Sequence, residues 1–318
     1  MAAAELTFRD GTVSDLETTF ALSEHAMHQS ATRSGVIAAG RELTDEHIRA
    51  DWLRQRSVVE FIAAQPQGRY VVAEDDEGRA IGYARVVRFP HMEELTELMV
   101  LPEYQGRGIG RRLLEVAWPG DPSADMGRVV VAAGAPSDLT LYLEVGVMPV
   151  AGHWHMRQRT DLYLERRAQE IETTDPGVHL LKPDRAVAEW LRLEPQAIGH
   201  ERPALHEFFA RERNCLAALD PRTGEATALC WVSKEGDIGP AVASEPGGLV
   251  PVIIAALDRV AMTQEPRQLS VFTTTLSWWL LRRLRQLGFS VFWPSWILCS
   301  VPLPGLDRYV PTRPAHLL

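Results

Sequence analysis

The segment from Glu94 to Ala117 constrains the possible folds more than any other part of the chain. Its pattern predicts a strand over Glu94–Val100, a loop with glycine at every second position, and an apolar helix over Gly108–Ala117. Arg128–Ala132 has the composition of a further buried strand. A strand, a helix and a strand in this order form a β-α crossing, which is a unit of mixed α/β sheets.

The elements on either side extend this unit over residues 1–160. They run as a strand, a helical insertion, an antiparallel meander and two β-α crossings, which together give an α/β fold with a mixed sheet. The predicted elements around the segment are Glu5–Arg9, a helix capped by Ser14, a helix capped by Thr44, the hairpin of Arg69–Glu74 with Ile81–Arg88, Leu139–Val145 and Val147–Arg159. We therefore predict a first domain over 1–160.

The second half of the chain shows the same order of elements. A polar segment over 161–177 has few large apolar residues and reads as a connector that is partly helical. The elements predicted beyond it are Ala226–Ser233, Asp237–Ala243, Leu249–Ala261, Leu269–Phe272, Ser277–Leu287 and Ser290–Ser300. We expect a second domain over 178–318 that arose by internal duplication, although few residues are shared between the halves.

Composition excludes several classes of protein. The chain has 318 residues, of which 46% are hydrophobic, so it is long enough for two cores. A net charge of -9 argues against a nucleic-acid partner, which selects a basic face. The three cysteines have no CxxC spacing, so we expect buried free thiols and no metal. We expect neither a leader nor a membrane span, and a cytoplasmic location, because no apolar run reaches about 18 residues.

The glycine-rich loop has the properties of an anion site. It precedes a helix N-terminus, where unpaired backbone N–H groups and the positive end of the helix dipole favour a phosphate. Glycine permits positive φ and a close approach of the phosphate to the main chain. The spacing is neither GxGxxG nor a P-loop, since the lysine followed by serine or threonine is missing. A pyrophosphate is therefore the expected ligand.

This stretch resembles the acetyl-CoA loop of the GNAT superfamily of N-acetyltransferases. The resemblance lies in the QxxGxG signature that starts at Gln105, after a strand that ends in Val-x-Pro. It implies a GNAT fold, with acetyl-CoA as co-substrate. It also implies that a bulge in the strand leaves backbone groups open to the pantetheine arm. The residues that it assigns to acetyl-CoA are Leu98, Met99, Val100, Gln105, Gly106, Arg107, Gly108, Ile109, Gly110 and Arg111.

The same resemblance implies a catalytic acid. Tyr142 lies four residues before Gly146, as in the Tyr-x-x-x-Gly-Phe segment of the family. A phenol has a reference pKa of about 10, so it is protonated at neutral pH and can give its proton to a leaving thiolate. The sequence departs from the family at two positions. Val147 replaces the phenylalanine, and Ala135 stands where many members have an asparagine that contacts the cofactor.

Two glutamates are candidates for the base that accepts the proton of the amine. The strand Arg128–Ala132 has no carboxylate, so the base must come from the strand before the loop. Glu94 and Glu97 are three positions apart, and this odd spacing places them on opposite faces of a regular strand. Glu94 matches the acidic position used by histone acetyltransferases of the superfamily. We favour Glu94, with water as the alternative proton carrier.

The second half lacks both signatures. Ala243–Gly248 stands where the cofactor loop would be, without the QxxGxG pattern. Leu284 lies four residues before Gly288, in the place that the tyrosine holds in the first half. We therefore expect a tandem GNAT-like arrangement with a degenerate second domain that does not catalyse.

Together these observations predict an enzyme that acetylates a small amine by direct attack on acetyl-CoA. Residues 16–65 are the expected region of acceptor choice, and the chain would act as a monomer or homodimer. Two other hypotheses stay open: an acyl-CoA-binding sensor without turnover, and an enzyme that acetylates the amine of a protein or peptide. The identity of the acceptor cannot be inferred from the sequence.

Overall fold

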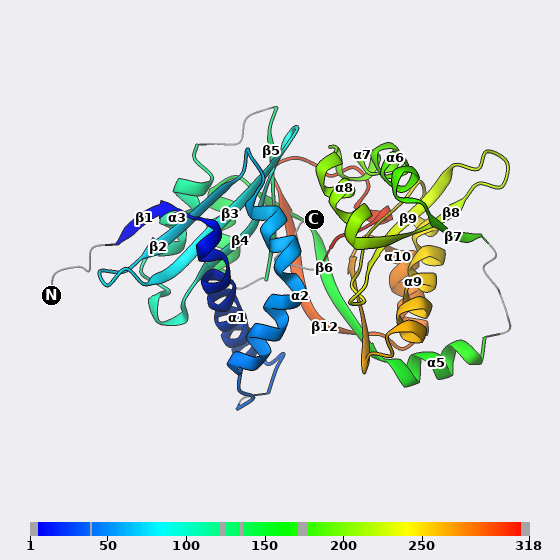
Figure 1. Ribbon diagram of the computed structural model, residues 1–318, viewed down its shortest axis with the longest axis horizontal. Coiled ribbons are helices and arrows are strands. Elements are labelled where there is room, and N and C mark those ends of the chain that lie inside the picture. Colours follow the sequence, from blue (N-terminus) through cyan, green and yellow to red (C-terminus); the bar gives the residue numbers. More distant parts are fainter. Residues whose placement is uncertain (1–5, 39, 121–124, 134–135, 171–176, 313–318) are drawn as a thin grey trace. The chain divides into compact units, whose positions relative to one another are not determined.

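The computed structural model describes residues 6–38, 40–120, 125–133, 136–170 and 177–312. The chain forms two compact units (Figure 1). The first unit comprises residues 1–88 and 92–130, and the second comprises 89–91 and 131–318. The boundary falls inside strand β5, at Val130, and each unit is described by itself below.

The first unit is a mixed sheet with helices on both faces. Its strands lie in the order β1-β2-β3-β4-β5, with β1, β2 and β3 antiparallel and β4 parallel to β5. The elements are β1 (Thr7–Asp10), α1 (Leu16–Arg33), α2 (Asp45–Ala63), β2 (Arg69–Glu74), β3 (Ala80–Phe89), β4 (Met92–Val100), α3 (Ile109–Ala117) and β5 (Gly127–Ala132). The predicted β-α crossing is confirmed by the parallel pairing of β4 with β5.

The two faces of this sheet are covered by different helices. Thr19 of α1 accepts a hydrogen bond from the side chain of Arg85 at 3.3 Å, so α1 lies against the face to which Arg85 points. A Cβ at Gly82, which lies three positions before Arg85 in β3, would approach Leu113 of α3 at 3.1 Å. Side chains of a strand alternate between faces, so α3 covers the opposite face. The helix α2 packs on α1, where the rings of Phe20 and Trp52 are 5.4 Å apart.

One of the two predicted caps in this unit is confirmed. The Thr44 hydroxyl accepts from the backbone N–H of His47 and begins α2. The prediction that Ser14 caps α1 is wrong. A 3-10 turn over Val13–Asp15 precedes the helix, and Thr12 begins that turn because its backbone N–H donates to the Asp15 carboxylate at 2.8 Å.

The second unit repeats the order of elements seen from β1 to β6, with the short α7 added. Its elements are α4 (Pro136–Glu144), β6 (Met148–Arg159), α5 (Thr160–Ala168), β7 (Val178–Leu181), α6 (Pro183–Leu193), α7 (Pro195–Ile198), α8 (Pro203–Glu212), β8 (Arg213–Leu219), β9 (Ala226–Ser233), β10 (Ile238–Ala243), α9 (Leu249–Thr263), β11 (Gln268–Thr274), α10 (Trp278–Gln286), β12 (Ser290–Cys299) and β13 (Tyr309–Val310). The hairpin, helices and strands predicted beyond residue 220 are all present, within a few residues of their expected bounds.

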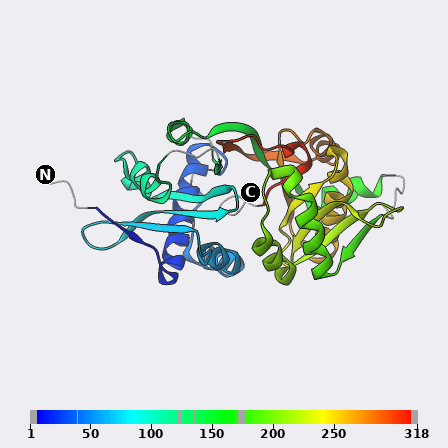
Figure 2. The same ribbon diagram turned by 90° about the horizontal axis from the view of Figure 1, so that it is seen from above.

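Strand β6 belongs to the second unit although it lies in the first half of the sequence. It pairs antiparallel with β11 on one side and with β12 on the other, and β6 (green) runs beside β12 (orange-red) in both views (Figures 1 and 2). The compact units divide at Val130, and the domain end at residue 160 stays a prediction. Part of the predicted linker is helical, as α5, and residues 171–176 lie outside the described part of the chain.

The core of the second unit is built around α9. The segment Pro246–Thr263 is the one helix among the described residues that is long and apolar enough to cross a membrane. Its apolar side chains, such as Ile253 and Leu257, are fully buried in a cluster with strands β9, β10 and β11. These contacts are those of a core helix. The three cysteines are buried and free, as predicted.

Candidate functional site

The loop between β4 and α3 forms an open cradle of backbone. Gly106 has φ of 77° and Gly108, the residue before α3, has φ of 81°. A Cβ at either position would meet no atom within 4 Å, so space is free directly above the main chain. Ile109 is buried and anchors the helix below the loop. The positive φ values explain why glycine is required, and the free space with a helix N-terminus fits a pyrophosphate.

The end of β4 leads into this cradle with an edge that β5 does not cover. The parallel register joins Met92–Leu95 to Gly127–Val130, and β4 continues to Val100 beyond its last paired residue in that register. Leu98, Met99 and Val100 are half-buried, in contrast to the buried residues before them. These three residues are where the resemblance places the pantetheine arm, and their accessibility agrees with that assignment.

Side chains of the loop mostly support its shape. The Gln105 side chain donates to the carbonyl of Val100 at 3.0 Å and ties the loop to the strand. Its oxygen accepts from Arg33 of α1 at 3.3 Å. Arg107 donates to the carbonyl of Glu103 at 2.9 Å, and its guanidinium lies 5.1 Å from the centre of the Tyr104 ring. Arg107 and Arg111 are exposed and supply positive charge beside the cradle.

The two candidate bases are both buried. Glu97 is 4% exposed and forms an ion pair with Arg85, with Oε2 3.0 Å from Nη1. The hydroxyl of Tyr83 donates to its other oxygen at 2.8 Å. Burial raises the pKa of the Glu97 carboxyl, and the charge of Arg85 opposes that shift. Glu94 is 1% exposed and lies opposite Val129 in the register with β5.

The ion pair of Glu97 was missed in the sequence. Arg85 is 1% exposed, and its guanidinium lies 4.8 Å from the centre of the Tyr70 ring and 5.0 Å from that of Tyr83. An arginine in the middle of the apolar strand β3 was the available signal, since a buried arginine needs an anionic partner. Glu97 is therefore part of the core on the face covered by α1.

Tyr142 lies in α4, in the second unit, and is 6% exposed. Burial, and after it the nearby Asp138 carboxylate, raises the pKa of the Tyr142 phenol well above its ordinary value of 10.0. Gly146, with φ of 81°, ends the turn after α4, and the Val147 N–H donates to the Tyr142 carbonyl at 3.3 Å. The phenol therefore stays protonated at any physiological pH. Ala135 lies outside the described residues.

The described residues offer few other sites. No group of three or more His, Cys, Asp or Glu side chains is positioned for a metal among them. His153 is fully buried, and burial lowers its pKa to about 3. Its Nδ1 lies 3.1 Å from the hydroxyl oxygen of Ser295, so His153 is a core residue.

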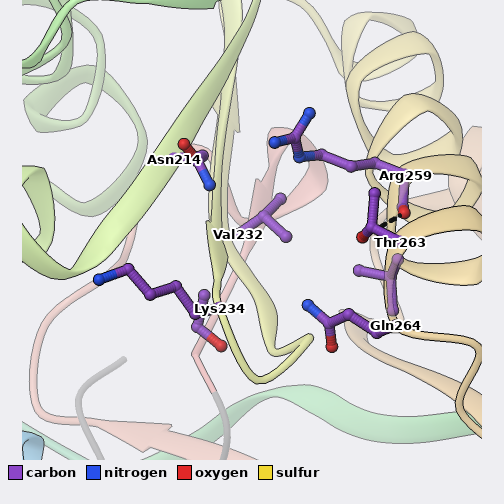
Figure 3. A pocket seen from close by; sticks show the side chains of 8 residues that line it. Asn214, Val232, Lys234, Arg259, Thr263 and Gln264 are labelled. Atoms are coloured by element: carbon purple, nitrogen blue, oxygen red, sulfur yellow. Dashed lines mark hydrogen bonds between the residues drawn. The ribbon is translucent and has the colours of Figure 1, made fainter.

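A pocket of about 210 Å³ lies between the β9–β10 turn and α9 in the second unit (Figure 3). Its charged lining residues are Lys234 and Arg259, and Thr263 donates to the carbonyl of Arg259 at 2.8 Å. The hydroxyl of Ser233 accepts from the backbone N–H of Asp237 at 3.0 Å and shapes the turn. None of the residues predicted for catalysis lines this pocket.

Comparison with known proteins agrees with the geometry of the cradle. Residues 66–143 match the model of the acetyltransferase (GNAT) domain. No curated protein matches the sequence. A putative acetyltransferase from Pyrococcus horikoshii has a similar structure, with a TM-score of 0.68 and 17% identity over 98% of this chain and 96% of that one.

Two further structures extend the similarity to both halves. A tandem GNAT protein from the clavulanic acid biosynthesis pathway has a TM-score of 0.61 and 18% identity, over 94% of this chain and 99% of that one. A GCN5-related N-acetyltransferase from Sphaerobacter thermophilus has a TM-score of 0.58 and 16% identity, over 92% and 95%. Residues 66–143 thus match a GNAT acetyltransferase domain, and the whole chain has a fold found in tandem GNAT proteins. Acyl transfer is the chemistry of this family.

Proposed function

We propose that the protein is an N-acetyltransferase that moves the acetyl group of acetyl-CoA to the amine of a small acceptor by direct attack. The observation that carries the proposal is the backbone cradle at Gly106 and Gly108, which is open to solvent, preceded by the accessible end of β4. Acetyl-CoA supplies the activated thioester. Main-chain N–H groups of the loop would hold its pyrophosphate, and backbone groups of Leu98–Val100 would pair with the pantetheine arm.

Tyr142 is the proposed acid in this reaction. Its raised pKa keeps the phenol protonated, so that it can donate a proton to the thiolate that leaves. The assignment follows from its position four residues before Gly146, as in the family. A backbone N–H near Leu98 or Val100 would stabilise the oxyanion, which requires no particular side chain.

Glu94 remains the proposed base, with water as the alternative. Glu97 is the weaker candidate because both of its oxygens lie against other groups, one against Arg85 and one against the Tyr83 hydroxyl. A base that is 1% exposed would need a water molecule to relay the proton from the amine.

The acceptor is proposed only by its chemical class, a small amine. Residues 16–65, which form α1 and α2, are the region where we expect acceptor choice, and the chain would work in the cytoplasm as a monomer or homodimer. The alternatives are a sensor that binds acyl-CoA without turnover and an enzyme that acetylates a protein or peptide.

An acceptor screen tests the proposal. The intact protein would be incubated with acetyl-CoA and a panel of small amines, aminoglycosides and peptides, and the release of CoA thiol would be followed. We expect one class of amine to be acetylated, and Tyr142→Phe to lower kcat by about 100-fold while acetyl-CoA affinity stays unchanged.

Tyr163→Phe is the control, because Tyr163 is also buried in the second unit and loses only a hydrogen bond to Asp258. Tight binding of acetyl-CoA with no acetylated amine in the panel would favour the sensor. Equal activity of Tyr142→Phe and the wild type would remove Tyr142 as the acid.

A further inference from the structure

We propose that the chain's own C-terminal strand, β13, occupies the place in the second unit that corresponds to the acetyl-CoA edge of the first, so that each chain binds a single acyl-CoA. The correspondence follows from the order of elements. β4, a loop, α3 and β5 in the first unit match β10, a loop, α9 and β11 in the second. The inference rests on the proposed function, because the comparison takes the end of β4 as the edge that binds acetyl-CoA.

The register of β13 places it on the matching residues. The pantetheine edge of the first unit is the last part of β4, Leu98–Val100. In the second unit the last part of β10 pairs antiparallel with β13, with Ala241 opposite Val310 and Val242 opposite Tyr309. The backbone groups that would otherwise face a pantetheine arm therefore pair with the chain itself.

The residues before β13 are bonded to the neighbouring elements as well. The carbonyl of Leu306 accepts from the hydroxyls of Thr274, at the end of β11, and Ser277, before α10. Arg308 donates to the carbonyl of Ser244, directly after β10, at 3.1 Å. The segment is thus bonded to the ends of both strands that correspond to the two sides of the first unit's edge.

Burial shows that this segment is part of the core. Leu306 is 2% exposed, and Tyr309 and Val310 are fully buried. The Tyr309 hydroxyl donates to the carboxylate of Glu194 at 3.2 Å and also accepts from Arg202, and both of these charged residues are fully buried. If β13 were withdrawn, the buried pair of Glu194 and Arg202 would lose its hydrogen bonds to the Tyr309 hydroxyl. This cost means that the strand is not readily displaced.

The loop after β10 also differs from the first unit's cradle at the residue before the helix. Gly248, the residue before α9, has φ of -67°, whereas Gly108 before α3 has φ of 81°. A Cβ at Gly248 would lie 3.0 Å from the Cβ of Ala243, so the space that is free above Gly108 is filled at the matching residue before α9, although a Cβ at Gly247 would meet no atom within 4 Å. The edge for the pantetheine arm is therefore filled in the second unit, and the residue before α9 differs from Gly108 in both its φ and its free space.

Calorimetric titration of the intact protein with CoA tests the stoichiometry. We expect one CoA per chain, and no binding to Gly108→Asp, whose carboxylate would repel the pyrophosphate in the first unit. Two CoA per chain, or one CoA retained by Gly108→Asp, would show that the second unit has a working site and would overturn the proposal.

Amide hydrogen exchange tests the strand without reference to CoA. The amides of residues 309–310 should exchange as slowly as those of β9, and CoA at saturation should leave their rates unchanged. Fast exchange there, or a change in rate upon CoA addition, would contradict the proposal. A protein that binds no CoA but protects these amides would refute the proposed function and leave the closed second unit standing.

Discussion

Removal of one charge from the Arg85–Glu97 pair leaves the other buried without compensation. Both side chains are nearly inaccessible, and replacing Glu97 by glutamine keeps the volume while removing the charge. We expect Glu97→Gln to lower the free energy of unfolding by about 3 kcal/mol, as for other buried pairs that lose one partner. Urea denaturation measures this change.

The matched control is Glu60→Gln. Glu60 pairs with Arg56 at 2.7 Å on the surface of α2, where solvent screens the charges, so its replacement should have no measurable effect. If the two variants were equally stable, Glu97 would not belong to a buried ion pair.

Asp15 gives the stability a dependence on pH. Its two oxygens accept from Arg9 at 2.7 and 2.9 Å, and the guanidinium holds the pKa of Asp15 well below its ordinary value of 3.8. A carboxyl whose pKa is lowered by folding stabilises the protein above its unfolded pKa, and this contribution is lost as the pH falls. Wild type and Asp15→Asn should therefore differ most in unfolding free energy at pH 7, and the difference should shrink below about pH 4. A constant difference from pH 7 to pH 3 would contradict this account.

Individual residues were predictable from the sequence when their role depends on neighbours along the chain. Thr44 as a cap and the glycines of the loop are of this kind, since a turn or a helix end fixes the requirement locally. The partner of Glu97 was not, because Arg85 comes from another strand and only folding brings the two together. For the same reason the choice between Glu94 and Glu97 could not be made from their spacing alone.

At the scale of one element, the N-terminus of α3 has a backbone conformation that strains any residue with a side chain, although the space for that side chain is free. Alanine at Gly108 would have to adopt φ near 81°, but it would touch no atom of the folded protein. The cost should therefore be the backbone strain alone, about 1–2 kcal/mol of unfolding free energy. Gly78, in the turn between β2 and β3, has φ of 74° and equally open surroundings, so Gly78→Ala should cost the same. Urea denaturation of both variants checks this; a much larger loss in Gly108→Ala would mean that the space is occupied.

At the scale of the whole molecule, β6 decides which part of the chain can fold alone. Its partners β11 and β12 come from beyond residue 267, so a chain cut at residue 160 would expose both edges of β6. We expect such a fragment to aggregate or to unfold without cooperativity, as followed by circular dichroism. Cooperative unfolding of the fragment would contradict the pairing. The order of the elements was predictable from local patterns, whereas the pairing of β6 with β11 and β12 was not, because it joins residues more than a hundred positions apart.

The central claim is that the cradle before α3 binds acetyl-CoA. Its most direct test is the acetyl-CoA affinity of Gly108→Ala beside that of Gly78→Ala, measured by calorimetry on proteins that share the same backbone strain. We predict a loss of at least about tenfold for Gly108→Ala, because its methyl group fills the space for the pyrophosphate, and a change below about twofold for Gly78→Ala. Equal affinities in the two variants would contradict the claim.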